Sequence, residues 1–124
     1  MSGKVQSPPD IAARCRTAVS AAADRKAQAV RVLELTQISS LADYFLVCSG
    51  SSERQVQAIA DAVVERLKAD KIRPHHVEGY QFGRWVLLDY GDFVVHVFEE
   101  STREFYALEK LWADAPDVTA EFAK

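Results

Sequence analysis

The sequence predicts one α/β (α+β) domain in which helices pack on a mixed five-stranded sheet. The first observation is size: 124 residues, 48% hydrophobic and 27% charged, fit one globular domain. The second is periodicity, because apolar residues recur at helical spacing in some segments and alternate or cluster in short runs elsewhere. The third is order. The segments follow one another as helix, strand, strand, helix, three strands and helix, which predicts a mixed sheet rather than a bundle or a sandwich.

Composition excludes several classes of protein. The chain has 15 Lys and Arg against 18 Asp and Glu, a formal net charge of -3, so we expect little or no direct nucleic-acid binding. Its apolar runs, such as residues 44–48, are far shorter than the roughly 20 residues of a membrane helix. Cys15 and Cys48 form neither a disulfide framework nor a CxxC pair. We therefore expect a cytoplasmic protein without membrane association.

The N-terminal half predicts one helix and two strands. We expect residues 1–9 to be a flexible segment, the domain to span 10–114, and 115–124 to be a frayed C-terminal tail. Pro8 and Pro9 stand where the first turn of a helix tolerates proline, and apolar residues then recur at helical spacing from Ile11 onward. Residues 29–35 and 43–49 are rich in β-branched, aromatic and aliphatic side chains and predict strands.

The central part predicts a second helix and an edge strand. Ser52 with Gln55 predicts a capping box at the helix start, and Pro74 ends any helical continuation beyond about Lys68. The expected buried stripe of this helix consists of Val56, Ile59, Ala60, Val63 and Leu67. Residues 75–78 predict a short edge strand.

Residues 84–98 predict a tight hairpin with two different faces. With Tyr90-Gly91 as a two-residue turn, Asp89 lies opposite Asp92 and Trp85 opposite His96. One face is then wholly apolar and belongs to the core: Val86, Leu88, Phe93, Val95 and Val97. The other is mixed: Trp85, Leu87, Asp89, Asp92, Val94, His96 and Phe98. A second capping box, Ser101 with Glu104, predicts a last helix that buries Phe105, Leu108, Leu111 and Trp112.

Two interpretations of the mixed face remain open. It could be a second helix-covered face in which Trp85 is core and a neighbouring polar group satisfies His96. It could instead be a docking surface, because tryptophan and tyrosine dominate binding hot spots. The candidate partner-binding residues are Trp85, Leu87, Asp89, Tyr90 and Asp92, with Tyr90 exposed at the turn tip and Tyr80 and Phe82 extending the aromatic patch. A basic partner would relieve the repulsion between Asp89 and Asp92.

Metal and thiol chemistry find little support. His75 and His76 are adjacent in a predicted strand and point to opposite faces, which is poor geometry for one metal ion. A Cys48–His96 nucleophile pair is conceivable, but Cys48 lies in an apolar run where a thiol usually behaves as a small hydrophobe. We expect no metal, no cofactor and no catalytic residue.

Nucleotidyl transfer is the strongest enzyme alternative. Gly50-Ser51, between a strand and a helix, matches the first half of that superfamily's pattern. The second half, two acids spaced i, i+2 on the following strand, is missing: Asp61 lies within the helix, and Asp89 and Asp92 are separated by a turn. Two-metal chemistry needs carboxylates that converge on shared ions. A nucleotidyltransferase-like enzyme or nucleotide-binding protein remains the alternative function.

Four motifs, in the right order, resemble the ribosome-silencing factor (Iojap) family over about residues 10–114. They are ADYFLV at 42–47 with SGSSERQV at 49–56, VEG at 77–79, WVLLDYGDFVVHVF at 85–98 and REFYALEKLW at 103–112. The resemblance implies a nucleotidyltransferase-like core without catalytic acids, and function by binding rather than catalysis.

The same resemblance implies specific partners. It implies attachment to the large ribosomal subunit through that subunit's fourteenth protein, which blocks association with the small subunit and represses translation under nutrient limitation. It also implies a homodimer when free. No transit peptide is evident, which favours a bacterial cytoplasmic version. A dimeric adaptor that acts away from the ribosome remains a third possibility.

Overall fold

The computed structural model of the protein describes residues 9–37, 42–106, 113 and 115–122. Five strands form one sheet in the order β1-β2-β5-β4-β3, and β2 pairs with β5 in parallel while the other neighbours are antiparallel. The predicted mixed five-stranded sheet is therefore confirmed. The elements are α1 (Pro9–Asp24), β1 (Gln28–Glu34), β2 (Tyr44–Gly50), α2 (Glu53–Ala69), β3 (His76–Glu78), β4 (Trp85–Asp89), β5 (Phe93–Glu99), α3 (Glu100–Tyr106) and α5 (Thr119–Phe122).

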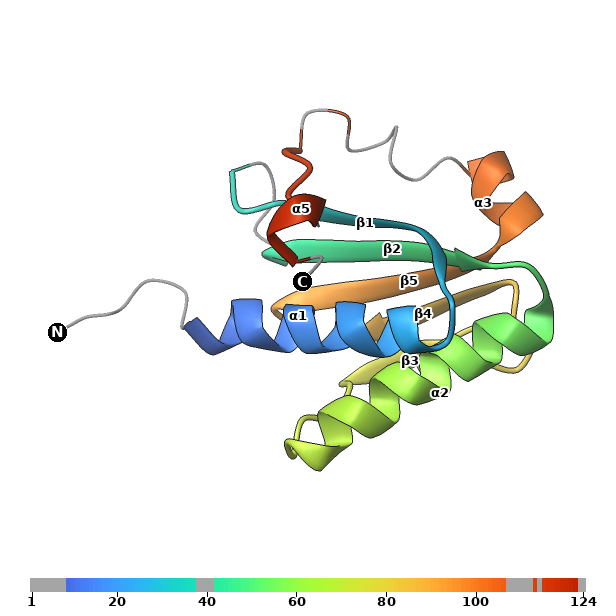
Figure 1. The fold of residues 1–124 in the computed structure, drawn as a ribbon, viewed down its shortest axis with the longest axis horizontal. Coiled ribbons are helices and arrows are strands. Elements are labelled where there is room, and N and C mark those ends of the chain that lie inside the picture. The colour runs from blue at the N-terminus through green and yellow to red at the C-terminus, as the bar shows by residue number, and fades with distance from the viewer. Residues whose placement is uncertain (1–8, 38–41, 107–112, 114, 123–124) are drawn as a thin grey trace, which may run out of the picture.

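Helices α1 and α2 pack side by side on one face of the sheet (Figure 1). The main core lies between them and the strands, and the whole predicted stripe of α2 is buried there. The side chain of Ser52 accepts a hydrogen bond from the Gln55 backbone N–H at 3.1 Å, as the capping box predicts. The Gln55 side chain, however, accepts from the N–H of Ser51 at 2.7 Å and not from that of Ser52. None of the helices in the described ranges has the length and apolar character of a membrane span.

The hairpin register differs from the predicted one by two residues. Trp85 pairs with Phe98, Leu87 with His96 and Asp89 with Val94, and the N–H of Tyr90 donates to the carbonyl of Phe93 at 3.0 Å. The turn is therefore Gly91-Asp92, and the predicted opposition of Asp89 and Asp92 is wrong. A positive φ of 87° at Gly91, the first central residue, suits a type II′ turn.

Tyr90 gives the physical reason for this register. Its ring is 5% exposed and stacks on Phe93 with centroids 4.9 Å apart, so it is buried in the core and not exposed at the turn tip. A turn at residues 90–91 would have left this large ring in water. Because the shift is two residues, each side chain keeps its predicted face.

The C-terminal segment packs against the sheet, which contradicts the expected frayed tail. The N–H of Glu34 donates to Pro116 O and the N–H of Val118 donates to Val32 O, so residues 116–118 cover the outer edge of β1. Phe122 is 2% exposed in the main core. Helix α3 begins at Glu100, so Ser101 is not its N-cap. The predicted apolar stripe beyond it, at 107–112, and the N-terminal segment 1–8 lie outside the described residues.

Candidate docking surface

The mixed face of the hairpin lies on the side of the sheet opposite α1 and α2. We use the term mixed face for six side chains that alternate with the core residues of β4 and β5: Trp85, Leu87, Asp89, Val94, His96 and Phe98. The three β4 members and Val94 are half-buried, whereas His96 and Phe98 are buried. β4 and Val94 therefore supply the accessible part of the face, and His96 and Phe98 lie beneath it.

Trp85 is held from two sides. Its ring stacks on Phe98, with centroids 4.9 Å apart and an angle of 27° between the planes. Its indole Nε1–H donates a hydrogen bond to Nδ1 of His96 at 3.1 Å. Trp85 thus packs against a small apolar cluster of Val47 and Phe98 and stays half-buried.

His96 is an imidazole enclosed by aromatic rings. The Phe45 ring meets it edge-on with centroids 4.5 Å apart, and the side chain is 3% exposed. Burial lowers the pKa of His96 to about 4, so the ring is neutral at neutral pH. Within the described residues its Nε2 has no hydrogen-bond partner. The expected polar neighbour of His96 is therefore Trp85, and it satisfies one of the two ring nitrogens.

The two acids near the turn occupy different environments. Oδ1 of Asp89 accepts a hydrogen bond from the Gly91 N–H at 2.8 Å, so this carboxylate also stabilises the turn. Asp92 is exposed as the second turn residue. Burial raises the pKa of Tyr90 to about 12, and its ring is not available for contact with a partner.

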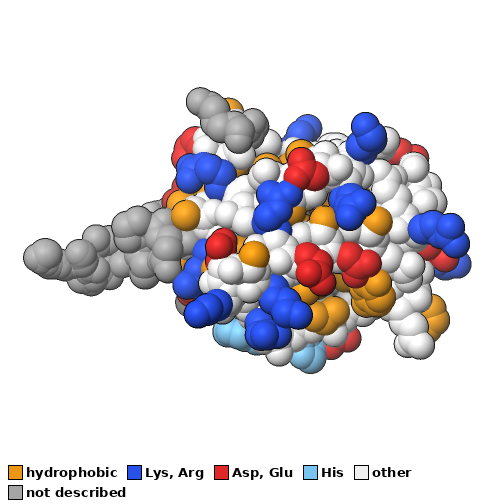
Figure 2. Space-filling view, turned by 60° about the horizontal axis from the view of Figure 1, so that its bottom comes forward, with side chains coloured by type: hydrophobic (Ala, Val, Ile, Leu, Met, Phe, Trp, Pro, Cys, Tyr) orange, Lys and Arg blue, Asp and Glu red, His pale blue; other side chains and the backbone are white. Residues whose placement is uncertain are grey.

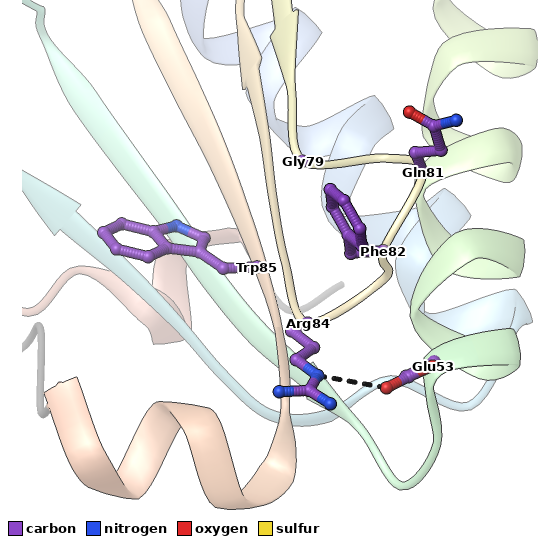
Figure 3. A pocket seen from close by; sticks show the side chains of 6 residues that line it. All are labelled: Glu53, Gly79, Gln81, Phe82, Arg84 and Trp85. Carbon is purple, nitrogen blue, oxygen red and sulfur yellow. Dashed lines mark hydrogen bonds and ion pairs between the residues drawn. The ribbon is translucent and has the colours of Figure 1, made fainter.

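A second aromatic surface lies in the β3–β4 loop, next to a surface pocket of about 600 Å³. The pocket is lined by Glu53, Gly79, Gln81, Phe82, Arg84 and Trp85. Figure 3 shows the Trp85 indole directed to the opposite side of the β4 ribbon from Phe82. Phe82 is 72% exposed and Tyr80 is 40% exposed. Phe82 and Trp85 therefore both line this pocket, but their rings point to opposite sides of β4.

Three polar residues of α2, spaced four apart, hold this loop. We name Glu53, Gln57 and Asp61 the polar stripe of α2. Glu53 accepts from Arg84 Nε at 3.1 Å, and Gln57 Nε2 donates to the Tyr80 carbonyl at 2.9 Å. Asp61 accepts from the Tyr80 hydroxyl at 3.1 Å. The sequence interpretation missed this role, although i, i+4, i+8 spacing places the three residues on one helix face.

The α1 and α2 side of the molecule has the character of a solvated helix surface. Figure 2 shows basic and acidic side chains interspersed over it, with apolar side chains scattered between them. Opposite charges also pair directly there, as Arg66 does with Asp24. The described residues on this side form no large field of one sign.

The sheet topology separates the residues that nucleotidyl transfer would need to bring together. Gly50 pairs with Glu99 at one end of the parallel β2–β5 pair, whereas Asp89 ends β4 and Asp92 lies in the turn before Phe93, at the other end. Asp61 binds Tyr80 on the surface of α2. In the described ranges no group of His, Cys, Asp or Glu has the geometry of a metal site.

The conceivable Cys48–His96 pair is split by strand alternation. Cys48 pairs with Val97 and faces the main core, while Val47 pairs with His96 on the other face. Burial raises the pKa of Cys48 to about 12, so this thiol is not activated.

A further residue that the sequence interpretation missed is Arg103, whose guanidinium donates to Ser49 Oγ at 2.9 Å and to Ala29 O at 2.6 Å. This buried arginine ties α3 to β1 and β2.

Comparison with known proteins identifies the family. Residues 8–124 match the family described as "Ribosomal silencing factor during starvation". The chain is 50% identical to ribosomal silencing factor RsfS of Halalkalibacterium halodurans over 84% of this chain and 89% of that protein. It is 44% identical to the RsfS of Bacillus subtilis over 86% of this chain and 91% of that protein.

A solved structure agrees in fold. The crystal structure of a Chromobacterium violaceum protein, 36% identical, superimposes with a TM-score of 0.80 over 82% of this chain and 84% of that one. The matched residues and the shared fold thus point to one conclusion: the chain belongs to the ribosomal silencing factor family.

Proposed function

We propose that this protein binds the large ribosomal subunit through the subunit's fourteenth protein, in the cytoplasm, and prevents association with the small subunit. Translation is thereby repressed under nutrient limitation. Family membership supports a ribosomal target, because relatives at 50% and 44% identity are named ribosomal silencing factors. The protein acts in this proposal by occupying a surface, without a cofactor, and forms a homodimer when free.

The observation that carries the docking face is the indole of Trp85. It is half-buried, stacked on Phe98 and hydrogen-bonded to His96, so a large contact surface is ordered before any partner arrives. Pre-ordered aromatic side chains are typical binding hot spots. Leu87 lies on the same face two residues along β4. Asp89 and Asp92 add negative charge that suits a basic protein partner.

The function is tested by subunit association. Purified large and small subunits are mixed with and without a saturating amount of the protein and separated by sedimentation. We expect the joined particle to be lost and the protein to travel with the large subunit. Normal joining at saturation would overturn the proposal, and binding of magnesium nucleotide without subunit binding would favour the enzyme alternative.

The docking face is tested by substitution. We expect Trp85→Ala to weaken large-subunit binding by about thirtyfold, since truncation of an interfacial tryptophan commonly costs 2 kcal/mol or more. An Asp89→Asn, Asp92→Asn double variant should bind with a shallower salt dependence. Phe82→Ala, on the other side of β4, is the matched control and should bind like the wild type. Weak binding by Phe82→Ala with normal binding by Trp85→Ala would place the contact on the β3–β4 loop.

A further inference from the structure

His96 occupies a position where an apolar side chain would cost less. It is 3% exposed, and its neighbours on the same face of β5 are Val94 and Phe98. Phe45 packs edge-on against the imidazole, with centroids 4.5 Å apart. Burying a polar ring among such groups is unfavourable unless its hydrogen bonds are made.

The bond to Trp85 determines the tautomer. An indole N–H only donates, so Nδ1 of His96 must accept and the neutral imidazole carries its proton on Nε2. That Nε2–H is buried and finds no acceptor in the described part of the chain. Among the described residues, His96 thus makes one polar contact, to the side chain proposed as the docking anchor, and its Nε2–H is left without an acceptor. A purely structural account explains the burial but not the choice of a histidine.

We infer that His96 is a positioning residue for docking: it holds the Trp85 indole in the orientation that the partner meets. This inference rests on the proposed docking face. Stacking on Phe98 restricts the tilt of the indole plane, and the hydrogen bond to Nδ1 restricts rotation within that plane. A side chain that is ordered in advance loses less freedom on binding. Removing the acceptor should therefore weaken binding by about two- to tenfold without unfolding the domain.

Two substitutions separate positioning from packing. His96→Phe fills the apolar site but removes the acceptor, so we expect thermal stability at least equal to the wild type and binding to purified large subunits about two- to tenfold weaker. His96→Asn places an amide oxygen where Nδ1 lies, so we expect lower stability but affinity near the wild type. A merely structural histidine would show affinity following stability in both variants, and that result would overturn the inference.

The indole proton gives a direct readout. In nitrogen-15 spectra we expect slow hydrogen exchange for the Trp85 Nε1–H in the wild type and in His96→Asn, and faster exchange in His96→Phe. Replacing Trp112 with Phe assigns the two indole signals. An indole proton whose exchange is the same in all three proteins would contradict the positioning role.

A double-mutant cycle tests whether His96 acts through Trp85. Trp85→Phe removes the donor, so adding His96→Phe to it should cause no further loss of affinity; an additional loss of the same size as in the wild type would overturn the inference. If His96→Phe fails to fold, His96→Leu takes its place, because it also removes the acceptor and leaves the indole intact, with about two- to tenfold weaker binding expected. Trp85→Ala distinguishes failure of the positioning role of His96 from failure of the docking face itself. Weak binding by Trp85→Ala with normal binding by His96→Phe rejects positioning but keeps the docking face, whereas normal binding by Trp85→Ala rejects both.

Discussion

The buried imidazole of His96 makes the free energy of unfolding depend on pH. Burial lowers its pKa from 6.5 to about 4, so the folded protein favours the neutral ring more than the unfolded chain does. The stability that this creates is fully present above pH 6.5 and is lost as pH falls through the interval from 6.5 to about 4. We expect a loss on the order of 3 kcal/mol across that interval.

Denaturant unfolding at several pH values between 7 and 4 measures this loss. Carboxylates also titrate toward the lower end, so the informative quantity is the difference between the wild type and His96→Phe. The difference should change steadily across the interval, because the variant lacks the titrating ring. Parallel pH profiles for the two proteins would show that His96 is not the group responsible.

Tyr90 shows what residue patterns can and cannot predict in the hairpin. Alternation predicted which side chains of β4 and β5 face the core, and registers that differ by two residues share that alternation. The choice between them depends on whether Tyr90 stacks on Phe93 or stands in water, which is a tertiary contact. The exposed position expected for Tyr90 was wrong for this reason, while Trp85 and Leu87 lie on the expected face.

At the scale of elements, α2 serves two sides of the molecule at once. Its apolar stripe packs on the sheet, while its polar stripe of Glu53, Gln57 and Asp61 holds the β3–β4 loop. The apolar stripe was predicted in full, since five buried residues follow helical spacing. The polar stripe was not predicted, because charged and amide residues have the same spacing whether they contact a loop or water.

Removing the central member of the polar stripe should loosen the loop without unfolding the helix. Gln57 donates to the carbonyls of Tyr80 and Gln81 at 2.9 and 3.2 Å, so Gln57→Ala leaves both without this donor. We expect faster amide exchange in residues 79–83 and a loss of about 0.5–1.5 kcal/mol in stability. Glu65→Ala, at an exposed position of the same helix, is the control. Equal amide exchange of residues 79–83 in the two variants would show that the polar stripe does not hold the loop.

At the scale of the whole molecule, the C-terminal segment completes the core from the far edge of β1. Phe122 packs edge-on against Tyr44 with centroids 5.3 Å apart, and the Arg16 guanidinium lies 5.3 Å from its ring centroid. The sequence did not predict that this segment packs against the core, because residues 113–124 are mostly small or polar and a single aromatic ring gives no periodicity. The expected mixed sheet, in contrast, followed from the order of elements and was confirmed.

Phe122→Ala should therefore destabilise the entire domain. The ring is 2% exposed, and truncation of a buried phenylalanine costs about 3–5 kcal/mol, which thermal unfolding will show as a large fall in Tm. Glu121→Ala, at the exposed neighbour, should melt like the wild type. Because Phe122 faces the helix side of the sheet, affinity for the large subunit per folded molecule should not change. A small fall in Tm would mean that the segment adds little to the core.

The parallel pairing of β2 with β5 has a kinetic consequence. The chain between the two strands contains α2, β3 and β4. β5 can therefore pair with β2 only when this long connection closes into a loop, which has an entropic cost. Phe45, Trp85 and His96 come from the three strands that this closure unites. We therefore expect the proposed docking face to form only when this pairing closes, so that binding of the large subunit and cooperative folding are gained together.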